Sequence, residues 1–528
     1  MIAELLVFLI TFLVVYFVYF HKLAKDKFRN CDVKFVPCWP VFGNARNSTV
    51  MKRHIFEDLD AVYRAFPDEK YVGYIEATLP VIMVRDPELI KKLTVEDFDH
   101  FMDHRQFFPE DVEPLFGGSV LMLQGKKWRN MRMTLSHAFT SSKMRHMMPF
   151  MTEISQNIIT YLKENLKEHE DVDVGDVIRR YTNDVITSTA FGIGVDSIKN
   201  KDNEFFKLGQ DIFTFSIWQR ILFFVASMWP NFNKKLRLPV FPQKTTDFFK
   251  TILTSTIDHR KKNKVERPDM IQLLMEASKG TLKDNSNENE KDSVGFATVD
   301  EALKPQGISR KWTVNELTGQ VFIFFTAGFE SSGSTLVMAI HELTINPHVQ
   351  DKLYQEIKEF KIKNNDLTYD NIGELKYLDC VLNETLRKWS AALILDRCCT
   401  KAYELPPPRE GGRRFKLKPG DIVYHAVNSI HLDEKYWPEP EKFDPDRFSD
   451  ENKHKIKPFT YMPFGVGPRN CLGSRFAILE LKVLLFDLIS NYKIVKSKKT
   501  LDPIVLELSL SLTVKPKGGS FVRLEKRA

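Results

Sequence analysis

A single cysteine stands out where the chain reads PFGVGPRNCLG, at residues 463–473. Glycines at 467 and 473 flank Cys471, Arg469 lies two residues before it, and the apolar run 474–490 follows at once. Glycine lets the backbone reach positive φ and lets a bulky partner approach, and a helix start offers unpaired N–H groups and partial positive charge. Together with Arg469, these surroundings would lower the pKa of a thiol and stabilise its thiolate.

A thiolate held in this way is either a nucleophile or a metal ligand. No base motif accompanies Cys471, as a nucleophile would require. A ligand of haem iron fits better, because a thiolate donates electron density that favours cleavage of an O–O bond. The alternative is a buried structural cysteine in a glycine-rich turn, but the fixed spacing from Phe464 to Gly473 favours the iron ligand.

An acid and a hydroxyl adjoin at Glu330 and Ser331, within the run 314–346. A run this long, apolar nearly all round in its middle, predicts a helix buried in a large core. A carboxylate there is costly unless it is paired or linked to water. The pair is therefore interpreted as a proton relay to a dry site, the alternative being two polar residues on a solvated face.

Two further pairs of side chains would share a helix face. Glu384 and Arg387 are three residues apart, and Trp128 and Arg132 are four apart. With Arg447 from a distant loop, the first pair could form a buried charge network that fixes the cysteine loop. The second could offer an indole N–H and a guanidinium to a buried carboxylate. A solvated surface pair is the alternative reading for Glu384 and Arg387.

These motifs, in this order, resemble the cytochrome P450 family of haem-thiolate monooxygenases. The family's FxxGxRxCxG stands complete as FGVGPRNCLG, its ExxR as ETLR and its WxxxR as WRNMR. PEKFDPDRF supplies the arginine that joins the ExxR pair, and AGFESS matches the oxygen motif A-G-x-D/E-T. The resemblance runs from about residue 40 to the C-terminus. It implies a mainly α fold with small β-sheets (α+β), as a single large helical haem domain.

The resemblance also implies a role for individual residues. Cys471 would be the sole protein ligand of the iron of haem b. The residues expected to bind the haem, four of them at its propionates, are Trp128, Arg132, Arg397, Phe464, Gly467, Arg469, Cys471 and Gly473. Those expected to border bound O2 are Ala327, Gly328, Glu330 and Ser331. Those expected to hold the fold are Glu384, Arg387 and Arg447.

The sequence departs from the family pattern at two places. Ser331 stands where the family usually has threonine, so the hydroxyl is kept and a methyl group is lost. Residues 390–392 are Ser-Ala-Ala where the family often has proline. We expect the first departure to affect coupling and oxygen geometry, and the second to leave more room at one edge of the substrate pocket.

The elements that must position these residues are mostly helices. Besides 314–346, amphipathic helices are expected at 348–360 and 377–390, and the alternation at 71–86 predicts a β-hairpin. Prolines and a glycine at 36–44 predict a stiff, non-helical connector. The polar, acidic stretch 279–300 has no periodicity and predicts a disordered surface loop.

The N-terminus predicts a membrane anchor. Residues 2–20 carry one charge, Glu4, and are long enough to cross a bilayer as a helix. The basic residues that follow place the rest of the chain on the cytoplasmic side. A cleaved signal peptide is the alternative, but a basic start and a small-residue cleavage site are missing. The expected organisation is an anchor (1–21), a basic and Pro-rich linker (22–44) and a haem-thiolate catalytic domain (45–528).

The amino-acid composition indicates which classes of partner and which compartment to expect. The net charge of +7 over 528 residues is dispersed, which argues against a nucleic-acid-binding protein. Six cysteines without a pairing pattern indicate a reducing compartment. The 41 phenylalanines, dense at 205–232 and 322–325, indicate a large apolar cavity or membrane contact as well as core packing.

The closest resemblance is to insect microsomal enzymes of the detoxifying type. It implies an unspecific monooxygenase of the endoplasmic reticulum membrane, which oxidises apolar xenobiotics, plant toxins or insecticides. No nucleotide-binding glycine motif is present, so electrons from NADPH would come through a separate reductase, with cytochrome b5 as a further candidate partner. Three alternatives stay open: oxidation of an endogenous hormone, lipid or pheromone, a reductase-independent isomerase or dehydratase, and a non-catalytic haem- or lipid-binding protein.

Overall fold

The computed structural model describes residues 2–527 except 215, 268, 280–293, 299–311 and 509–512. The first helices are α1 (Ile2–Asn30), α2 (Arg46–Thr49), α3 (Ile55–Arg64), α4 (Pro87–Lys91), α5 (Gly125–Ser136), α6 (Ser141–Asn165), α7 (Val174–Phe191) and α8 (Glu204–Phe213). The others are α9 (Ile217–Met228), α10 (Pro230–Leu236), α11 (Gln243–Asn263), α12 (Met270–Lys279), α13 (Val314–Ile345), α14 (Pro347–Lys363), α15 (Lys376–Lys388), α16 (Val427–His431) and α17 (Ser474–Asn491).

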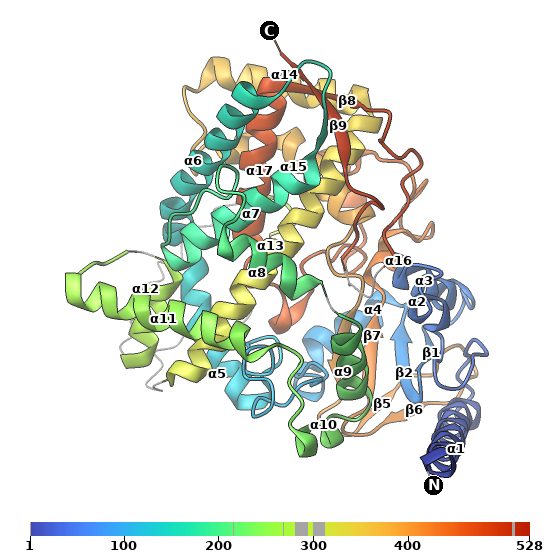
Figure 1. The fold of residues 1–528 in the computed structure, drawn as a ribbon. Coiled ribbons are helices and arrows are strands. Elements are labelled where there is room, and N and C mark those ends of the chain that lie inside the picture. Colours follow the sequence, from blue (N-terminus) through green and yellow to red (C-terminus); the bar gives the residue numbers. More distant parts are fainter. Residues whose placement is uncertain are drawn as a thin grey trace.

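The strands are short and form three small sheets. They are β1 (Tyr71–Glu76), β2 (Leu79–Val84), β3 (Asp171–Asp173), β4 (Leu395–Cys398), β5 (Tyr403–Leu405), β6 (Phe415–Leu417), β7 (Ile422–His425), β8 (Tyr492–Lys496) and β9 (Phe521–Lys526). The sheet orders are β1-β2-β7-β4, β3-β9-β8 and β5-β6. The predicted class, mainly α with small sheets, is confirmed (Figure 1).

Helix α13 runs through the middle of the helical part of the molecule (Figure 1). Thr313 and Glu316 form a capping box at its start, which satisfies N–H groups that a helix otherwise leaves unpaired. Most of its residues are buried, and it packs against α7, α11, α15 and α17. The main core forms around it, as the uninterrupted apolar run predicts.

A second core lies on the four-stranded sheet. Strands β1 and β2 form the predicted hairpin, with Tyr71 opposite Val84. Strand β7 joins β2 in parallel, and β4 pairs with β7 so that Arg397 lies opposite Val423. This sheet therefore holds the Arg397 side of the candidate site, whereas the main core holds the α13 side.

Helix α1 extends further than the predicted anchor. Its outer part is apolar and exposed, as expected of a membrane span, and its last turns continue through residues 22–30. Ala24 and Phe28 are buried in the second core, so part of the predicted linker is helix that packs on the body. Residues 36–44 are non-helical, as predicted.

The helices predicted at 314–346, 348–360, 377–390 and after Cys471 are confirmed as α13, α14, α15 and α17. The predicted disordered loop mostly lies outside the described residues. For 294–298 the prediction is wrong: Val294 and Ala297 are buried, Lys482 Nζ donates to the Val294 carbonyl at 2.6 Å, and the Phe296 N–H donates to Asp379 at 2.9 Å. These five residues are docked on the core because two buried side chains and two polar contacts hold them.

Candidate functional site

The cysteine loop is held in one tight conformation. The Cys471 N–H donates to the Phe464 carbonyl at 2.8 Å, and the Asn470 N–H donates to that of Gly467 at 2.9 Å. Gly467 has a φ of +71°, and a Cβ there would come within 2.0 Å of the Thr94 carbonyl oxygen. Only glycine tolerates both conditions. Helix α17 begins at Ser474 with Gly473 as its N-cap, so Cys471 stands at a helix N-terminus as predicted.

The Cys471 side chain is accessible, although protein surrounds it closely enough to affect its ionisation. Burial raises the pKa of the thiol, while the Gly473 N–H and the positive charge of Arg132 act in the opposite direction. The predicted help from the helix start is present. The thiol pKa is therefore raised, where the sequence predicted a lowered one, and the positive charge that opposes burial is that of Arg132 rather than of Arg469. Arg469 instead donates to Met102, Asp103 and Leu123.

Three of the predicted propionate-binding residues are interlocked. Trp128 and Arg132 lie four residues apart on α5, both buried. The guanidinium carbon of Arg469 lies 3.9 Å from the centre of the Trp128 ring, and Arg469 donates to the carbonyls of Met102 and Leu123 at 2.8 Å. Arg132 donates to the backbone carbonyl and the side-chain oxygen of Asn470, the residue before the cysteine. Helix α5 is thereby tied to the cysteine loop.

Arg397 has few partners of its own. It is 1% exposed, donates to the carbonyls of Asp396 at 2.8 Å and Val466 at 3.3 Å, and its Nε has no hydrogen-bond partner. It forms no ion pair in the described part of the chain. Burial lowers the pKa of Arg397 to about 10. Burial, followed by the charge of Arg397, lowers that of Arg469 to about 9.

Two carboxylates and a histidine surround these arginines. Asp103 accepts from Arg469 at 3.2 Å. Asp396 contacts His104 Nδ1 at 2.8 Å and accepts from the Arg105 N–H at 2.6 Å, and His104 holds the pKa of Asp396 well below its usual range despite burial. Sequence reasoning missed these groups, although Asp396 directly precedes Arg397.

The residues present fit a cofactor that carries carboxylates. Arg397 and Arg469 are buried, and burial lowers the pKa of both guanidinium groups although the Asp103 and Asp396 carboxylates act in the opposite direction. The unpartnered Nε of Arg397 is a donor that lacks an acceptor. Two propionates would supply both the charge and the acceptor, because bidentate guanidinium–carboxylate contacts are among the strongest polar contacts in proteins.

In its middle, α13 has one accessible face, whereas most of the helix is buried. Ala327 is exposed, and Phe324, Gly328 and Ser331 are partly exposed; their spacing of three and four residues puts them on one stripe. Phe139 stacks on Phe324 with 5.3 Å between ring centres, and a Cβ at Gly473 would lie 3.5 Å from the Phe139 ring. The stripe therefore adjoins the cysteine loop, with Phe139 between them.

Glu330 does not share the stripe with Ser331. Its carboxylate pairs with Lys515 Nζ at 2.7 Å and accepts from the Thr513 hydroxyl at 2.8 Å, beside a cavity of about 410 Å³. The Ser331 hydroxyl donates to the Ala327 carbonyl at 2.7 Å. Successive helix residues point about 100° apart, so the acid and the hydroxyl face different surroundings here. Their joint action as a relay stays a prediction.

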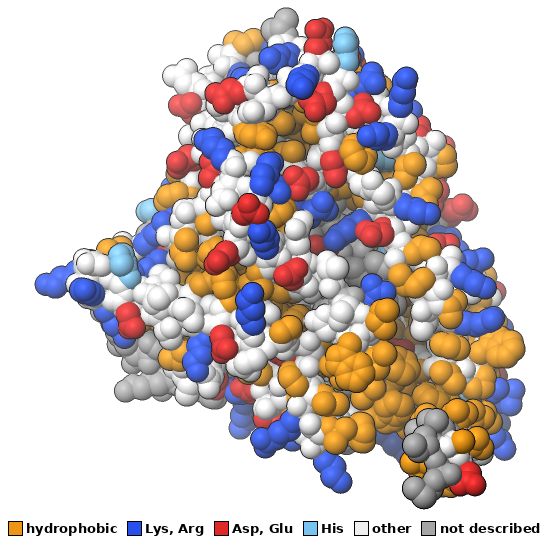
Figure 2. All heavy atoms as spheres, in the orientation of Figure 1, with side chains coloured by type: hydrophobic (Ala, Val, Ile, Leu, Met, Phe, Trp, Pro, Cys, Tyr) orange, Lys and Arg blue, Asp and Glu red, His pale blue; other side chains and the backbone are white. Residues whose placement is uncertain are grey.

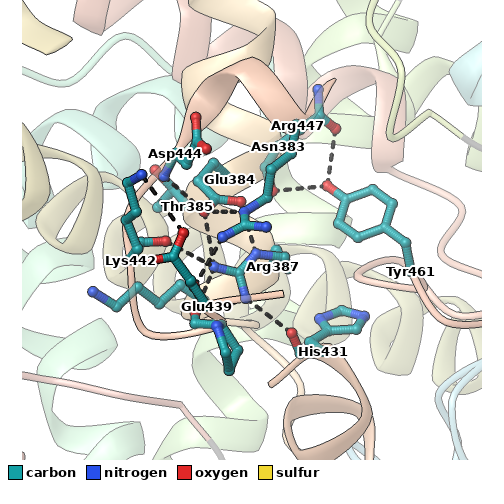
Figure 3. A network of polar contacts seen from close by, with 12 residues as sticks. Asn383, Glu384, Thr385, Arg387, His431, Glu439, Lys442, Asp444, Arg447 and Tyr461 are labelled. Atoms are coloured by element: carbon teal, nitrogen blue, oxygen red, sulfur yellow. Dashed lines mark hydrogen bonds and ion pairs between the residues drawn. The ribbon is translucent and has the colours of Figure 1, made fainter. Parts of the chain in front are cut away.

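The Glu384, Arg387 and Arg447 residues form the buried network predicted for them (Figure 3). Arg387 binds Glu384 through two parallel hydrogen bonds of 2.7 and 2.8 Å and also donates to the carbonyls of His431 and Pro440. Arg447 Nε lies 3.4 Å from Glu384, which accepts from the Asp444 N–H at 2.9 Å. The surface-pair alternative is excluded, because Glu384 and Arg387 have no exposed surface.

The network also reaches the chain that leads to the cysteine. The Met462 N–H donates to His431 Nε2 at 2.9 Å. Tyr461 donates to the Asn383 side chain at 2.9 Å (Figure 3). Residues 461 and 462 directly precede the cysteine loop. The network is therefore placed to support that loop from α15 and α16.

Comparison with known proteins agrees with these motifs. A family model described as Cytochrome P450 matches residues 34–522. The chain is 40% identical over 520 residues to Cytochrome P450 9e2 of Blattella germanica, covering 95% of this chain and 94% of the relative. It is 37% identical over 515 residues to Probable cytochrome P450 9f2 of Drosophila melanogaster, with 95% of each chain covered. It is 34% identical over 477 residues to Cytochrome P450 6k1 of Blattella germanica, covering 90% of this chain and 88% of the relative.

Proposed function

The chain belongs to the cytochrome P450 family, and from this premise we propose that it oxidises apolar xenobiotics with O2 and electrons from NADPH. The family is one of haem-thiolate monooxygenases. The finer statement, that plant toxins and synthetic insecticides are the substrates and that a separate membrane reductase supplies the electrons, is ours. Cytochrome b5 is a second electron donor in this proposal.

The observation that carries the proposal is the accessible Cys471 thiol beside the α13 stripe. In the proposal Cys471 binds the haem iron, and Trp128, Arg132, Arg397 and Arg469 hold the propionates. The haem, when bound, supplies the activation of O2. Arg132 favours the thiolate, the tight cysteine loop fixes the sulfur, and Ser331 holds a proton at its Oγ, next to the space where oxygen would bind.

The proposed apolar character of the substrate is supported by the phenylalanine side chains that pack on α13. Phe116 and Phe241 both pack on Phe322 of α13, with ring centres 6.4 and 5.2 Å apart. Phenylalanine rings exclude water and offer no hydrogen bond, so they favour ligands recognised by shape and apolar area. A polar metabolite would leave its own groups unpaired against these rings.

Localisation at the endoplasmic reticulum rests on α1 and its neighbours. Hydrophobic side chains gather over α1 and α9 on one end of the molecule (Figure 2). Exposed members include Phe8, Phe12, Ile217 and Trp218. An apolar helix beside an apolar surface is typical of a protein that is anchored in a bilayer and also lies on it. In the proposal the catalytic domain faces the cytoplasm.

The decisive test replaces Cys471 with serine or histidine in the full-length, membrane-bound protein. The wild type should give the red-shifted ferrous–CO Soret band of a thiolate ligand, and both variants should lose it. Cys38→Ser, in the connector, is the matched control and should keep the band. A thiolate band in Cys471→Ser would overturn the ligand assignment.

Turnover tests the substrate class. Purified protein with a P450 reductase and NADPH should form oxygenated products from a panel of apolar insecticides and plant toxins. Products only from steroid-like or lipid substrates would move the proposal to an endogenous role. Conversion that proceeds without reductase and O2 would replace the monooxygenase proposal by an isomerase or dehydratase.

A further inference from the structure

Glu113 is a buried carboxyl group with no part in the chemistry proposed above. It lies in the loop between Phe101 and α5 and is 1% exposed. One carboxylate oxygen accepts from the N–H groups of Val240 and Phe241, each at 3.1 Å. No Lys, Arg or His pairs with it among the residues that the structure describes. Burial raises the pKa of Glu113 to about 7, against the effect of these backbone N–H groups.

The loop that carries Glu113 is itself fixed to α13. Gln320 accepts from the Val120 N–H at 2.8 Å and donates to the Gly118 carbonyl at 2.8 Å. A Cβ at Gly319 would lie 3.0 Å from the Gly118 carbonyl carbon, so loop and helix touch backbone to backbone. Glu113 therefore extends from a rigid support.

Val240 and Phe241 belong to the segment that joins α10 to α11. With α9 and α10 this segment forms the outer cover of the molecule at the end next to α1 (Figure 1). The Trp229 indole N–H donates to the Tyr16 hydroxyl at 2.7 Å, so the cover also touches the anchor. We call α9, α10 and residues 237–242 the cover.

The cover meets the loop in a small apolar cluster, while Phe241, near the end of the cover, packs on Phe322 in the main core. Phe108, Leu222, Ala226 and Val240 form a small cluster of their own, apart from the two main cores. Phe223 of α9 adds ring contacts with Phe107 and Phe108 at 6.0 and 5.4 Å. Apolar contacts lack direction and can slide, whereas two hydrogen bonds to one buried oxygen fix a position.

We propose that Glu113 is a latch that holds the cover closed against the loop before α5 and so sets the rates at which bulky substrates enter and leave. This rests on the proposed function, since it assumes that apolar substrates reach the space beside Cys471. Glu113 is a positioning residue: it acts through the backbone of Val240 and Phe241 and touches no reacting atom. When the Glu113 carboxylate releases the Val240 and Phe241 N–H groups, these two donors lose their acceptor and need water in its place. Opening of the cover is therefore disfavoured until a ligand or the membrane brings water or apolar surface to this site.

The test compares three variants of the haem-loaded, full-length protein in nanodiscs. Glu113→Leu keeps the volume and removes the acceptor, Glu113→Gln keeps a carbonyl oxygen, and Glu110→Gln alters a carboxyl of the same loop that pairs with Lys127. The probes are a bulky apolar imidazole that binds haem iron, followed by stopped-flow absorbance, and carbon monoxide as a small ligand. Exchange of the Val240 and Phe241 amides is followed by mass spectrometry.

Glu113→Leu should raise both the association and dissociation rates of the imidazole by about tenfold, with its Kd nearly unchanged. Exchange at residues 240–241 should accelerate, and carbon monoxide binding should not change. Glu113→Gln and Glu110→Gln should behave like the wild type. Unchanged imidazole rates and unchanged exchange in folded Glu113→Leu would overturn the proposal.

If Glu113→Leu does not take up haem, Glu113→Asp provides the second test. It keeps the charge and is one methylene too short to reach both N–H groups, so both rates and exchange should rise less than in Glu113→Leu; wild-type values would again overturn the latch. The two proposals fail separately. A wild type without a thiolate–CO band would refute the proposed function, while the exchange measurement would still decide the latch.

Discussion

Arg387 and Arg397 are both almost completely buried, yet their surroundings differ. Arg387 has a carboxylate, Glu384, in bidentate contact and two backbone carbonyls within 2.9 Å. Arg397 has two backbone carbonyls, an unpartnered Nε and no ion pair within the described chain. The charge of Arg387 is neutralised by a carboxylate in direct contact. Asp396 acts on Arg397 without forming a direct ion pair among the described residues, and the Nε of Arg397 has no acceptor there.

The difference separates a structural arginine from a binding arginine. A buried charge is stable only when its partners are in place, so the protein keeps Arg387 with its own carboxylate for folding. A buried charge without that partner is costly, and burial has already lowered the pKa of Arg397. A buried arginine of this kind is therefore expected where a ligand supplies the paired anion.

Removal of Arg387 should have the largest effect. Arg387→Ala leaves the Glu384 carboxylate buried and should lower the free energy of unfolding by about 3–5 kcal/mol. Since the network also holds the chain that precedes Cys471, we expect no haem-loaded protein. Arg414→Ala, which breaks an exposed pair with Glu404, is the control for loss of an arginine. A haem-loaded Arg387→Ala protein with slow turnover would contradict the structural role.

Removal of Arg397 should lower haem affinity without lowering the stability of the haem-free protein. Arg397→Met takes away a buried cation that forms no direct ion pair among the described residues, so the haem-free protein should unfold at the same denaturant concentration or a higher one. Haem affinity, measured by transfer to apomyoglobin, should fall about tenfold to a hundredfold because a propionate loses its partner. A haem-free Arg397→Met protein as unstable as Arg387→Ala would erase the distinction between the two arginines.

Acid should weaken the Arg387 network through His431. Burial and then the charge of Arg387 lower the pKa of His431 to about 3, so it is neutral in the native state. The unfolded chain takes up this proton below about pH 6.5. Between these values the unfolded state binds more protons, so the free energy of unfolding falls as the pH falls, by about 1.4 kcal/mol per pH unit at most from this group.

His431→Gln should flatten the acid limb of a pH series of urea titrations, since glutamine can still accept the Met462 N–H and does not titrate. His169→Gln, at an exposed histidine, is the control. A slope between pH 4 and 6 that His431→Gln leaves unchanged would assign the acid sensitivity to other groups.

Ser331 lies outside both arginine networks, so its removal should leave stability alone. Ser331→Ala should bind substrate normally, but the amount of product formed per NADPH consumed should fall by about twofold or more. The reason is that the hydroxyl that holds a proton is gone. Ser331→Thr, which restores the family's usual residue, should couple at least as well as the wild type. An unchanged product ratio in Ser331→Ala would remove this hydroxyl from proton delivery.

Residues joined by short spacing were predictable from the sequence. Glu384 with Arg387 and Trp128 with Arg132 lie on one helix face, because helix geometry places i+3 and i+4 neighbours together. The position of Cys471 at a helix start was also predictable from neighbouring residues, because glycines flank it and an apolar run follows it.

Contacts between distant parts of the chain were not predictable. Glu330 is turned by Thr513 and Lys515, nearly two hundred residues away, and no local pattern encodes that pairing. His104 and Asp103 join Asp396 and Arg469 only after β4 has paired in the four-stranded sheet. The docking of residues 294–298 depends on Lys482 and Asp379, which composition cannot indicate.

Phe28 fixes the rotation of α1 about its own axis relative to the rest of the protein. Its ring fills the space beside Gly73, where a Cβ would lie 2.7 Å away, and Lys27 pairs with Asp421 at 2.8 Å. Because α1 is continuous, these contacts set the direction of every side chain toward its start, including Tyr16 at Trp229. One residue inserted between 17 and 23 would turn the outer helix by about 100°, and four would bring it back to within about 40°. In the membrane-anchored protein proposed above, the register of this one helix would determine the orientation of the whole body relative to the bilayer.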